Sequence, residues 1–195
     1  HLDLPGNETL RAYVLRRAKT SIGMLFRTLR SAGISVLQIE HALEGVPLAF
    51  TVEATGAAQQ FTAPLFGSID FTGIDENGSP VLLDFKWTKS TSRYANYVAT
   101  HEALQLATYA WAYGAQRGEM REPRSGYFML RHAEFVTLDR GLGGRGESGE
   151  TSDGSLALFE RLRATIEDEL SAIAQGRVTS ALGDIALANG LSPLD

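Results

Sequence analysis

The spacing of apolar residues divides the chain into helical and extended segments. Between Glu8 and Ser31 apolar residues recur at helical intervals, which predicts one amphipathic helix. Asn7 stands where a helix cap is expected, and Gly33 stands where the chain can leave the helix. The positions that we expect to face inward are Leu10, Val14, Ile22, Leu25, Phe26 and Leu29.

Residues 34 to 88 instead show the pattern of apolar and β-branched residues that is typical of strands. ISVLQIEHAL and VPLAFTVEA flank a predicted turn near Glu44, Gly45 and Pro47, and Gly56 marks a second turn. QQFTAPLFGSIDFTGID follows, and ENGSP separates it from PVLLDFKWT. This pattern predicts three or four consecutive antiparallel strands.

The second half of the chain again alternates between helical and strand patterns. After the polar stretch KSTSRYANY we expect a helix from about Ala99 to Arg117, then the strands GYFMLRH and EFVTLD. The segment 139–155 is glycine-rich, Leu156 to Ala174 is a strongly amphipathic helix, and the last twenty residues look loosely structured. This order predicts an α/β (α+β) fold with a central mixed sheet flanked by helices. We divide it into an N-terminal helical extension (1–33), a core (34–178) and a C-terminal tail (179–195).

Two charged residues interrupt the apolar strand PVLLDFKWT. Because successive side chains alternate between faces, Asp84 and Lys86 share one face with Leu82. A solvated pair on an edge strand would explain them. The preceding strand, however, places Asp70 on a face with Ser68 in the same way.

The loop between these strands decides whether the two acids meet. A two-residue Asn77-Gly78 turn would send Asp70 and Asp84 to opposite faces of the sheet. A three-residue loop, Glu76 to Gly78, with Gly78 in a left-handed conformation, places Asp70 directly opposite Asp84. We predict the three-residue loop, or another connection of the same parity.

Two opposed carboxylates repel each other unless positive charge lies between them. Lys86 neutralises only one of them, whereas a divalent cation neutralises both. The chain has no cysteine, so its hard oxygen ligands favour Mg²⁺ or Mn²⁺ over Zn²⁺. Such an ion activates water and polarises a phosphoryl oxygen, and Lys86 would orient the water or stabilise the charge on phosphorus.

Composition describes an ordinary globular chain of one domain. Of the 195 residues, 44% are hydrophobic and 21% are charged, which excludes a disordered or fibrous protein. There is no apolar run of membrane-spanning length and no signal-peptide pattern, so we expect no membrane partner and a cytoplasmic setting. The absence of cysteine excludes disulfides and thiolate-bound metals within this stretch.

Three short motifs together resemble the RecB-like branch of the PD-(D/E)XK nuclease superfamily (RecB/AddB-type nuclease domain). Gly67 to Asp70 is similar to its G-x-x-D motif, Asp84 to Lys86 to D-x-K, and Gln105 to Tyr109 to Q-x-x-x-Y. The order and the strand, strand, helix context make the resemblance more specific than any single motif. It implies a restriction-endonuclease-like core whose catalytic residues are Asp70, Asp84, Lys86, Gln105 and Tyr109.

The resemblance implies that Asp70 and Asp84 hold Mg²⁺ or Mn²⁺ and that Gln105 and Tyr109, which share a helical face, support the site or contact DNA. Glu40 is a further candidate ligand, in competition with Glu44 and Glu53, and the backbone carbonyl of Phe85 is another. Two departures stand out. No His lies between Leu2 and Glu40, where many members have a ligand on an N-terminal helix, and the cysteines of a cluster-binding member are absent.

Charge says less about the partner than the motifs do. The net charge of −5 argues against a domain that grips nucleic acid by its summed charge. Residues 10–30 are nevertheless basic without an acid, although a solvated helix face would explain that segment as well. The candidates for DNA contact are Arg16, Arg17, Lys19, Lys89 and Arg93.

We interpret the chain as a metal-dependent deoxyribonuclease, with an exonuclease favoured over an endonuclease. The resemblance and the start at His1 suggest the nuclease module of a helicase–nuclease or repair protein, with a helicase domain or subunit outside this segment. The alternative is a catalytically inactive DNA-end-binding or scaffolding module. A G-x-G-x-x-G match at 141–146 would indicate a nucleotide site, but no apolar helix follows it, so we expect a loop.

Overall fold

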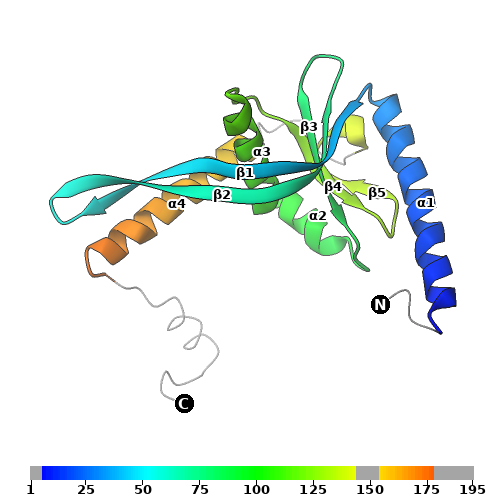
Figure 1. The fold of residues 1–195 in the computed structure, drawn as a ribbon, viewed down its shortest axis with the longest axis horizontal. Helices are drawn as coiled ribbons and strands as arrows, with labels where there is room; N and C mark the ends of the chain where they lie inside the picture. Colours follow the sequence, from blue (N-terminus) through cyan, green and yellow to red (C-terminus); the bar gives the residue numbers. More distant parts are fainter. Residues whose placement is uncertain (1–5, 144–153, 178–195) are drawn as a thin grey trace. The chain divides into compact units, whose positions relative to one another are not determined.

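The computed structural model describes residues 6–143 and 154–177. The elements are, in chain order, α1 (Glu8–Ser31), β1 (Ser35–Ala54), β2 (Ala57–Ile74), β3 (Pro80–Lys86), α2 (Ser92–Ala99), α3 (Leu104–Arg117), β4 (Arg124–Met129), β5 (Glu134–Val136), a 3₁₀ turn η1 (Arg140–Leu142) and α4 (Ser155–Ala174) (Figure 1).

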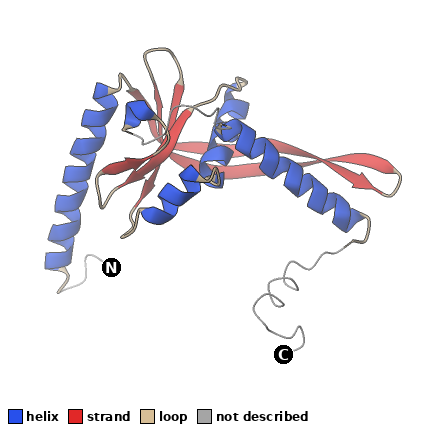
Figure 2. Ribbon diagram, turned by 180° about the vertical axis from the view of Figure 1, so that it is seen from behind, coloured by secondary structure: helices blue, strands red, loops and turns tan. Residues whose placement is uncertain are grey.

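The strands, drawn in red in Figure 2, form one sheet. Its order is β1-β2-β3-β4-β5. β3 pairs with β2 and β4 pairs with β5 in antiparallel fashion, whereas β3 and β4 are parallel. A parallel pair requires a long crossover, and α2 and α3 supply it. The predicted mixed sheet flanked by helices is therefore confirmed. Among the described helices, none has the length and apolar character needed to cross a bilayer.

Contacts divide the described chain into two compact units, and the first contains most of the sheet. It comprises the residues up to Pro47 and those from Pro64 to Leu162. On one face of this sheet, Leu25 and Leu29 of α1 pack in a core with Phe71, Val81 and Leu83. On the other face, Leu106 of α3 packs with Tyr127, Met129 and Val136. The alternation along β3 therefore sends its odd-numbered side chains toward α1 and its even-numbered ones toward α2 and α3.

The second unit joins the tip of the β1–β2 hairpin to the later part of α4. The backbone amides of Thr51 and Glu53 donate to the side chains of Glu167 and Ser171, at 2.8 and 2.9 Å. Gln175 Nε2 donates to the carbonyl of Glu53 at 2.9 Å. Helix side chains thus satisfy backbone groups along the edge of β1, which would otherwise be open to pairing with another strand.

The N-terminal helix has the predicted bounds but buries fewer of its apolar residues than expected. Leu25 and Leu29 are buried, whereas Leu10, Ile22 and Phe26 are each about half exposed. The prediction was wrong for these three because only the stripe ending in Leu25 and Leu29 meets the sheet. Gly33, with φ of 63°, lets the chain leave the helix as predicted. Asn7 occupies the N-cap position, but its side chain makes no capping hydrogen bond.

The predicted turn near Glu44 and Pro47 is wrong, because β1 runs through it as one long strand. Gly45 has a φ of 63° inside that strand, so its conformational freedom serves a local distortion instead of a chain reversal. The turn at Gly56 is confirmed, with φ of 92°. Two long strands therefore precede β3.

The single helix predicted from Ala99 to Arg117 is also wrong. The chain forms α2 and α3, separated at residues 100–103, where His101 has a φ of 53°. The polar stretch before Ala99 forms α2, although no residue of α2 is fully buried. Residues 144–153 of the predicted glycine-rich loop and the whole of the predicted C-terminal tail (179–195) lie outside the described residues.

Candidate functional site

The hairpin turn between β2 and β3 sets the register of the two strands. The amide of Asp75 donates to the carbonyl of Ser79, and the amide of Gly78 donates to the carbonyl of Asp75, both at 3.0 Å. Gly78 has a φ of 75°, which glycine adopts at little cost. Because Asp75 and Ser79 face each other, the loop has the three residues that we predicted.

The register continues from this turn toward the acids. The strands are paired as far as Phe71 and Leu83, and the same register carried one residue further brings Asp70 opposite Asp84. Beside that step the amide of Phe85 donates to Asp70 Oδ2 at 2.6 Å. Directly opposed residues have Cα atoms roughly 4.5 to 5.5 Å apart. The two carboxylates therefore belong to one step of the sheet, on the face covered by α2 and α3.

Asp84 is the most buried charged group of the site, with only 2% of its surface exposed. Its Oδ2 lies 2.6 Å from Lys86 Nζ, and apart from this ion pair the oxygen has no hydrogen-bond partner among the described residues. Burial raises the pKa of Asp84, Lys86 partly counters that increase, and the charge of Asp70 adds to it. The site therefore holds more negative charge than its own cation neutralises.

The amine of Lys86 is held by a chain of hydrogen bonds from α3. Lys86 Nζ donates to Gln105 Oε1, and Gln105 Nε2 donates to the hydroxyl of Tyr109, both at 2.9 Å. The four-residue spacing puts Gln105 and Tyr109 on the same side of the helix. Burial raises the pKa of Tyr109, so the neutral phenol accepts this bond at physiological pH. The structure thus brings together all five residues that we predicted to be catalytic.

The donor set suits a hard divalent cation. The carboxylates of Asp70 and Asp84, one of them with a buried oxygen that contacts only the Lys86 amine, are the kind of oxygen ligands that Mg²⁺ prefers. Within the described residues, however, no three His, Cys, Asp or Glu side chains gather as a metal site. The carboxylate of Glu40 accepts from Ser68 Oγ at 3.2 Å and does not complete such a group with the two aspartates. The Phe85 carbonyl remains a prediction.

The basic residues predicted to contact DNA do not gather in one place. Arg93 of α2 lines a cleft together with Lys86. Lys89 is exposed, close to the end of β3. Arg16, Arg17 and Lys19 are exposed on α1, which packs on the sheet face opposite to that of Asp84 and Lys86. Only Arg93 is therefore placed beside the candidate site.

Sequence reasoning missed the aromatic residues of the cleft. Tyr94 and Tyr97 of α2 and Tyr127 of β4 line it together with Lys86. The signal was present, since Tyr94 and Tyr97 are spaced by three residues and fall on one side of a helix. We had interpreted their surroundings as a polar connection, so the spacing carried no weight.

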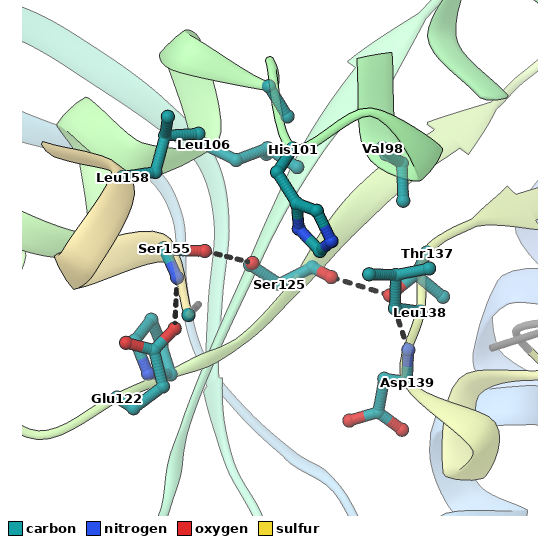
Figure 3. Close-up of a pocket in the computed structure, with 13 residues that line it drawn as sticks. Val98, His101, Leu106, Glu122, Ser125, Thr137, Leu138, Asp139, Ser155 and Leu158 are labelled. Atoms are coloured by element: carbon teal, nitrogen blue, oxygen red, sulfur yellow. Dashed lines mark hydrogen bonds between the residues drawn. The ribbon is translucent and has the colours of Figure 1, made fainter. Parts of the chain in front are cut away.

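A second pocket lies between β4 and the start of α4 (Figure 3). Glu122 accepts the amides of Ser155 and Leu156 with its two carboxylate oxygens, at 2.6 and 3.0 Å, and so caps α4. Ser125 Oγ lies 3.0 Å from Ser155 Oγ, and Thr137 donates to the carbonyl of Ser125 (Figure 3). These polar groups bond mainly to one another, so their role is to dock the helix on the sheet.

The sequence matches the family model of the PD-(D/E)XK nuclease superfamily over residues 6–183, which is most of the chain. None of the curated proteins with which it was compared is similar to it. Nucleases of this superfamily generally use divalent metal ions, in keeping with the opposed aspartates described above. The chain belongs to the PD-(D/E)XK nuclease superfamily.

Proposed function

We propose that this chain is a Mg²⁺- or Mn²⁺-dependent deoxyribonuclease of the RecB-like branch. The observation that carries the proposal is the β2–β3 register, which leads toward Asp70 and Asp84, together with the bond from the Phe85 amide to Asp70 and the ion pair of Lys86 with Asp84. The hydrogen-bonded pair Gln105 and Tyr109 supports the branch assignment, because Q-x-x-x-Y is its third motif. Within this proposal the chain acts as the nuclease module of a helicase–nuclease or repair protein and removes nucleotides from DNA ends.

Each side chain has a role that follows from its position. Asp70 and Asp84 would hold the divalent ion, which when bound supplies charge neutralisation and an acidified water. Lys86 donates a hydrogen bond toward the attacking water or the phosphate and offsets the negative charge that develops on phosphorus. Gln105 fixes the direction of the Lys86 amine, and Tyr109 fixes Gln105 in turn. Asp84 must be ionised for this arrangement to work.

The proposal is tested by incubating linear and covalently closed circular DNA with the protein in Mg²⁺, in Mn²⁺ and in EDTA. We expect the wild type to degrade linear DNA only when a divalent ion is present. Asp84→Ala and Lys86→Ala should each reduce the rate by at least about 100-fold, because each removes a group needed in the transition state. Glu119→Ala, which removes an exposed acid that lines a different pocket together with Gly78 and Arg121, is the matched control and should retain full activity.

Circular dichroism and melting curves separate lost chemistry from lost fold. The two site variants should keep the wild-type spectrum, because neither removes an apolar group from the core. Added Mn²⁺ should raise the melting temperature of the wild type but not that of Asp84→Ala. Equal cleavage by all four proteins would refute the nuclease assignment. Metal-dependent DNA binding without cleavage by the wild type would instead favour the end-binding module.

A further inference from the structure

A cleft of about 630 Å³ opens directly beside Lys86, on the α2 side of the site. This volume is within the range of pockets that take small organic ligands. Two of its lining residues, Lys86 and Gln105, belong to the catalytic group proposed above. The others that matter here are Arg93, Tyr94, Tyr97 and Tyr127. Whatever binds in the cleft therefore lies next to the reacting phosphate.

The three tyrosines form a fixed aromatic surface. The ring of Tyr94 meets that of Tyr127 at a centroid distance of 4.9 Å and 62°, and that of Tyr97 at 6.2 Å and 87°. Such edge-to-face contacts hold the rings in place. Tyr127 is only 2% exposed and forms the floor, whereas Tyr94 and Tyr97 are partly exposed. The cleft thus offers two immobilised rings to a ligand.

Two cations border these rings. Arg93 Nε donates to the hydroxyl of Tyr97 at 2.7 Å, and its guanidinium carbon lies 5.4 Å from the centroid of that ring. Lys86 Nζ lies 5.8 Å from the centroids of Tyr94 and Tyr127. Aromatic rings beside positive charge are the means by which proteins hold single-stranded nucleic acid, with the base on the ring and the phosphate on the cation. The lining also includes one acid, Glu102, and the partly exposed Leu104.

We propose that this cleft receives an unpaired nucleobase adjoining the phosphodiester that is cleaved, so that single-stranded DNA ends are the preferred substrate. The inference rests on the proposed nuclease function and adds the substrate class to it. A base in a duplex has both faces stacked and its edge paired, so placing it in the cleft costs unstacking energy that an unpaired end does not pay.

The test uses end-labelled single-stranded oligonucleotides in which one abasic residue is moved along the chain. Binding is measured in EDTA, and cleavage is measured separately in Mn²⁺. We expect an abasic residue at one or two positions next to the cleavage point to weaken binding by about 5- to 150-fold, the range for the loss of one stacked base. Abasic residues elsewhere should have little effect. A blunt duplex of the same sequence should bind more weakly than the single strand.

Variants of one tyrosine complete the test. Tyr97→Leu should weaken binding of the intact oligonucleotide and should no longer respond to the abasic residue, because ring and base act as a pair. Tyr97→Phe keeps the ring and should behave like the wild type in the abasic scan. Tyr13→Leu is the matched control, since Tyr13 of α1 also has an arginine over its ring, Arg17 at 5.8 Å, but lies on the other face of the sheet.

The abasic scan on the wild type needs no variant, so an unfolded Tyr97→Leu would not leave the inference untested. The inference would be overturned if the affinity were the same wherever the abasic residue is placed. It would also be overturned if Tyr97→Leu and Tyr13→Leu weakened binding equally. Failure of the nuclease proposal looks different. In that case the wild type would not cleave in Mn²⁺, while base-dependent binding in EDTA would still support the cleft.

Discussion

At the scale of single residues, Asp84 combines a functional requirement with a cost to the fold. Its carboxylate is buried, and burial is the main reason for its raised pKa. The unfolded chain therefore loses the proton of Asp84 at lower pH than the folded chain does. Stability from this group is complete below the unfolded value near 3.8 and is lost as the pH rises through the folded value. At neutral pH the ion-free protein bears an unfavourable charge.

The first prediction follows from this sign. Asp84→Asn should raise the melting temperature of the protein in EDTA at pH 8, because burying a neutral amide costs less free energy than burying a charged carboxylate. The gain should be on the order of 1 kcal/mol, or about 2 to 4 °C for a chain of this size. It should shrink as the pH is lowered toward 4, where the wild-type carboxyl takes up a proton. A melting temperature at or below that of the wild type at pH 8 would contradict the prediction.

Gln105 lets positioning be tested apart from chemistry. Its Oε1 accepts from Lys86 and its Nε2 donates to Tyr109. Gln105→Leu leaves the lysine amine with Asp84 but removes the hydrogen bond that fixes its direction from α3, so we expect kcat to fall about 10- to 100-fold, the effect of removing a supporting hydrogen bond at a metal site. KM should change little. Gln105→Glu still accepts from Lys86 and can accept from the Tyr109 hydroxyl, so it should recover part of the rate. Steady-state kinetics of both variants decide this. An increase in KM with kcat unchanged would indicate that Gln105 binds DNA instead.

At the scale of elements, the turn between β2 and β3 determines whether the acids meet. Asp75 Oδ1 accepts the amides of Asn77 and Ser79, at 2.9 and 2.8 Å, and so fixes the loop by its side chain. The bond from Ser79 is the main reason that the pKa of Asp75 is lowered, and Arg124 contributes as well. A lowered pKa means stability that is present above pH 3.8 and lost as the pH falls through the folded value.

Asp75→Ala should therefore destabilise the protein by about 1.5 kcal/mol at pH 7, the lower end of the range for hydrogen bonds to a charged group. The difference between variant and wild type should diminish below pH 3.8, because the carboxyl of the unfolded wild-type chain then takes up a proton and the unfolded state is favoured. Urea unfolding at pH 7 and at pH 3 measures both effects. Ser79→Ala, which retains the amide that bonds to Asp75, is the control. An equal deficit at both pH values would show that the charge of Asp75 is not involved.

The same elements show what could be predicted from the sequence. Alternation along two strands and the parity of one loop were enough to set Asp70 opposite Asp84, because a shift of one residue would turn an entire apolar face outward. The sequence could not show whether Gly45 lies in a turn or in a strand, since glycine with positive φ occurs both in turns and in distorted strands. The break at His101 was missed for a related reason. A non-glycine residue in that conformation has no sequence signal of its own, and here it coincides with a backbone hydrogen bond from the amide of Glu102 to the carbonyl of Tyr97.

At the scale of the whole molecule, charge is distributed unevenly over a chain with a net charge of −5. Within the unit that contains most of the sheet, the basic residues of α1 lie on one face, and Arg93 lies on the other beside Lys86. Affinity for DNA depends on how many phosphates the protein contacts, and it falls with salt in proportion to that number. The salt dependence of binding therefore reports which face the DNA touches.

Replacing one arginine on each face compares them under the same conditions. If single-stranded DNA enters along α2, Arg93→Gln should reduce the slope of log affinity against log salt by about 0.7, the value for one phosphate contact. Arg16→Gln should leave the slope unchanged, although both variants remove the same charge from an exposed helix. Titrations of a labelled oligonucleotide between 50 and 200 mM KCl, in the absence of divalent ions, resolve such a difference. The opposite result would move the DNA path to α1, and equal losses would mean that the strand reaches both faces.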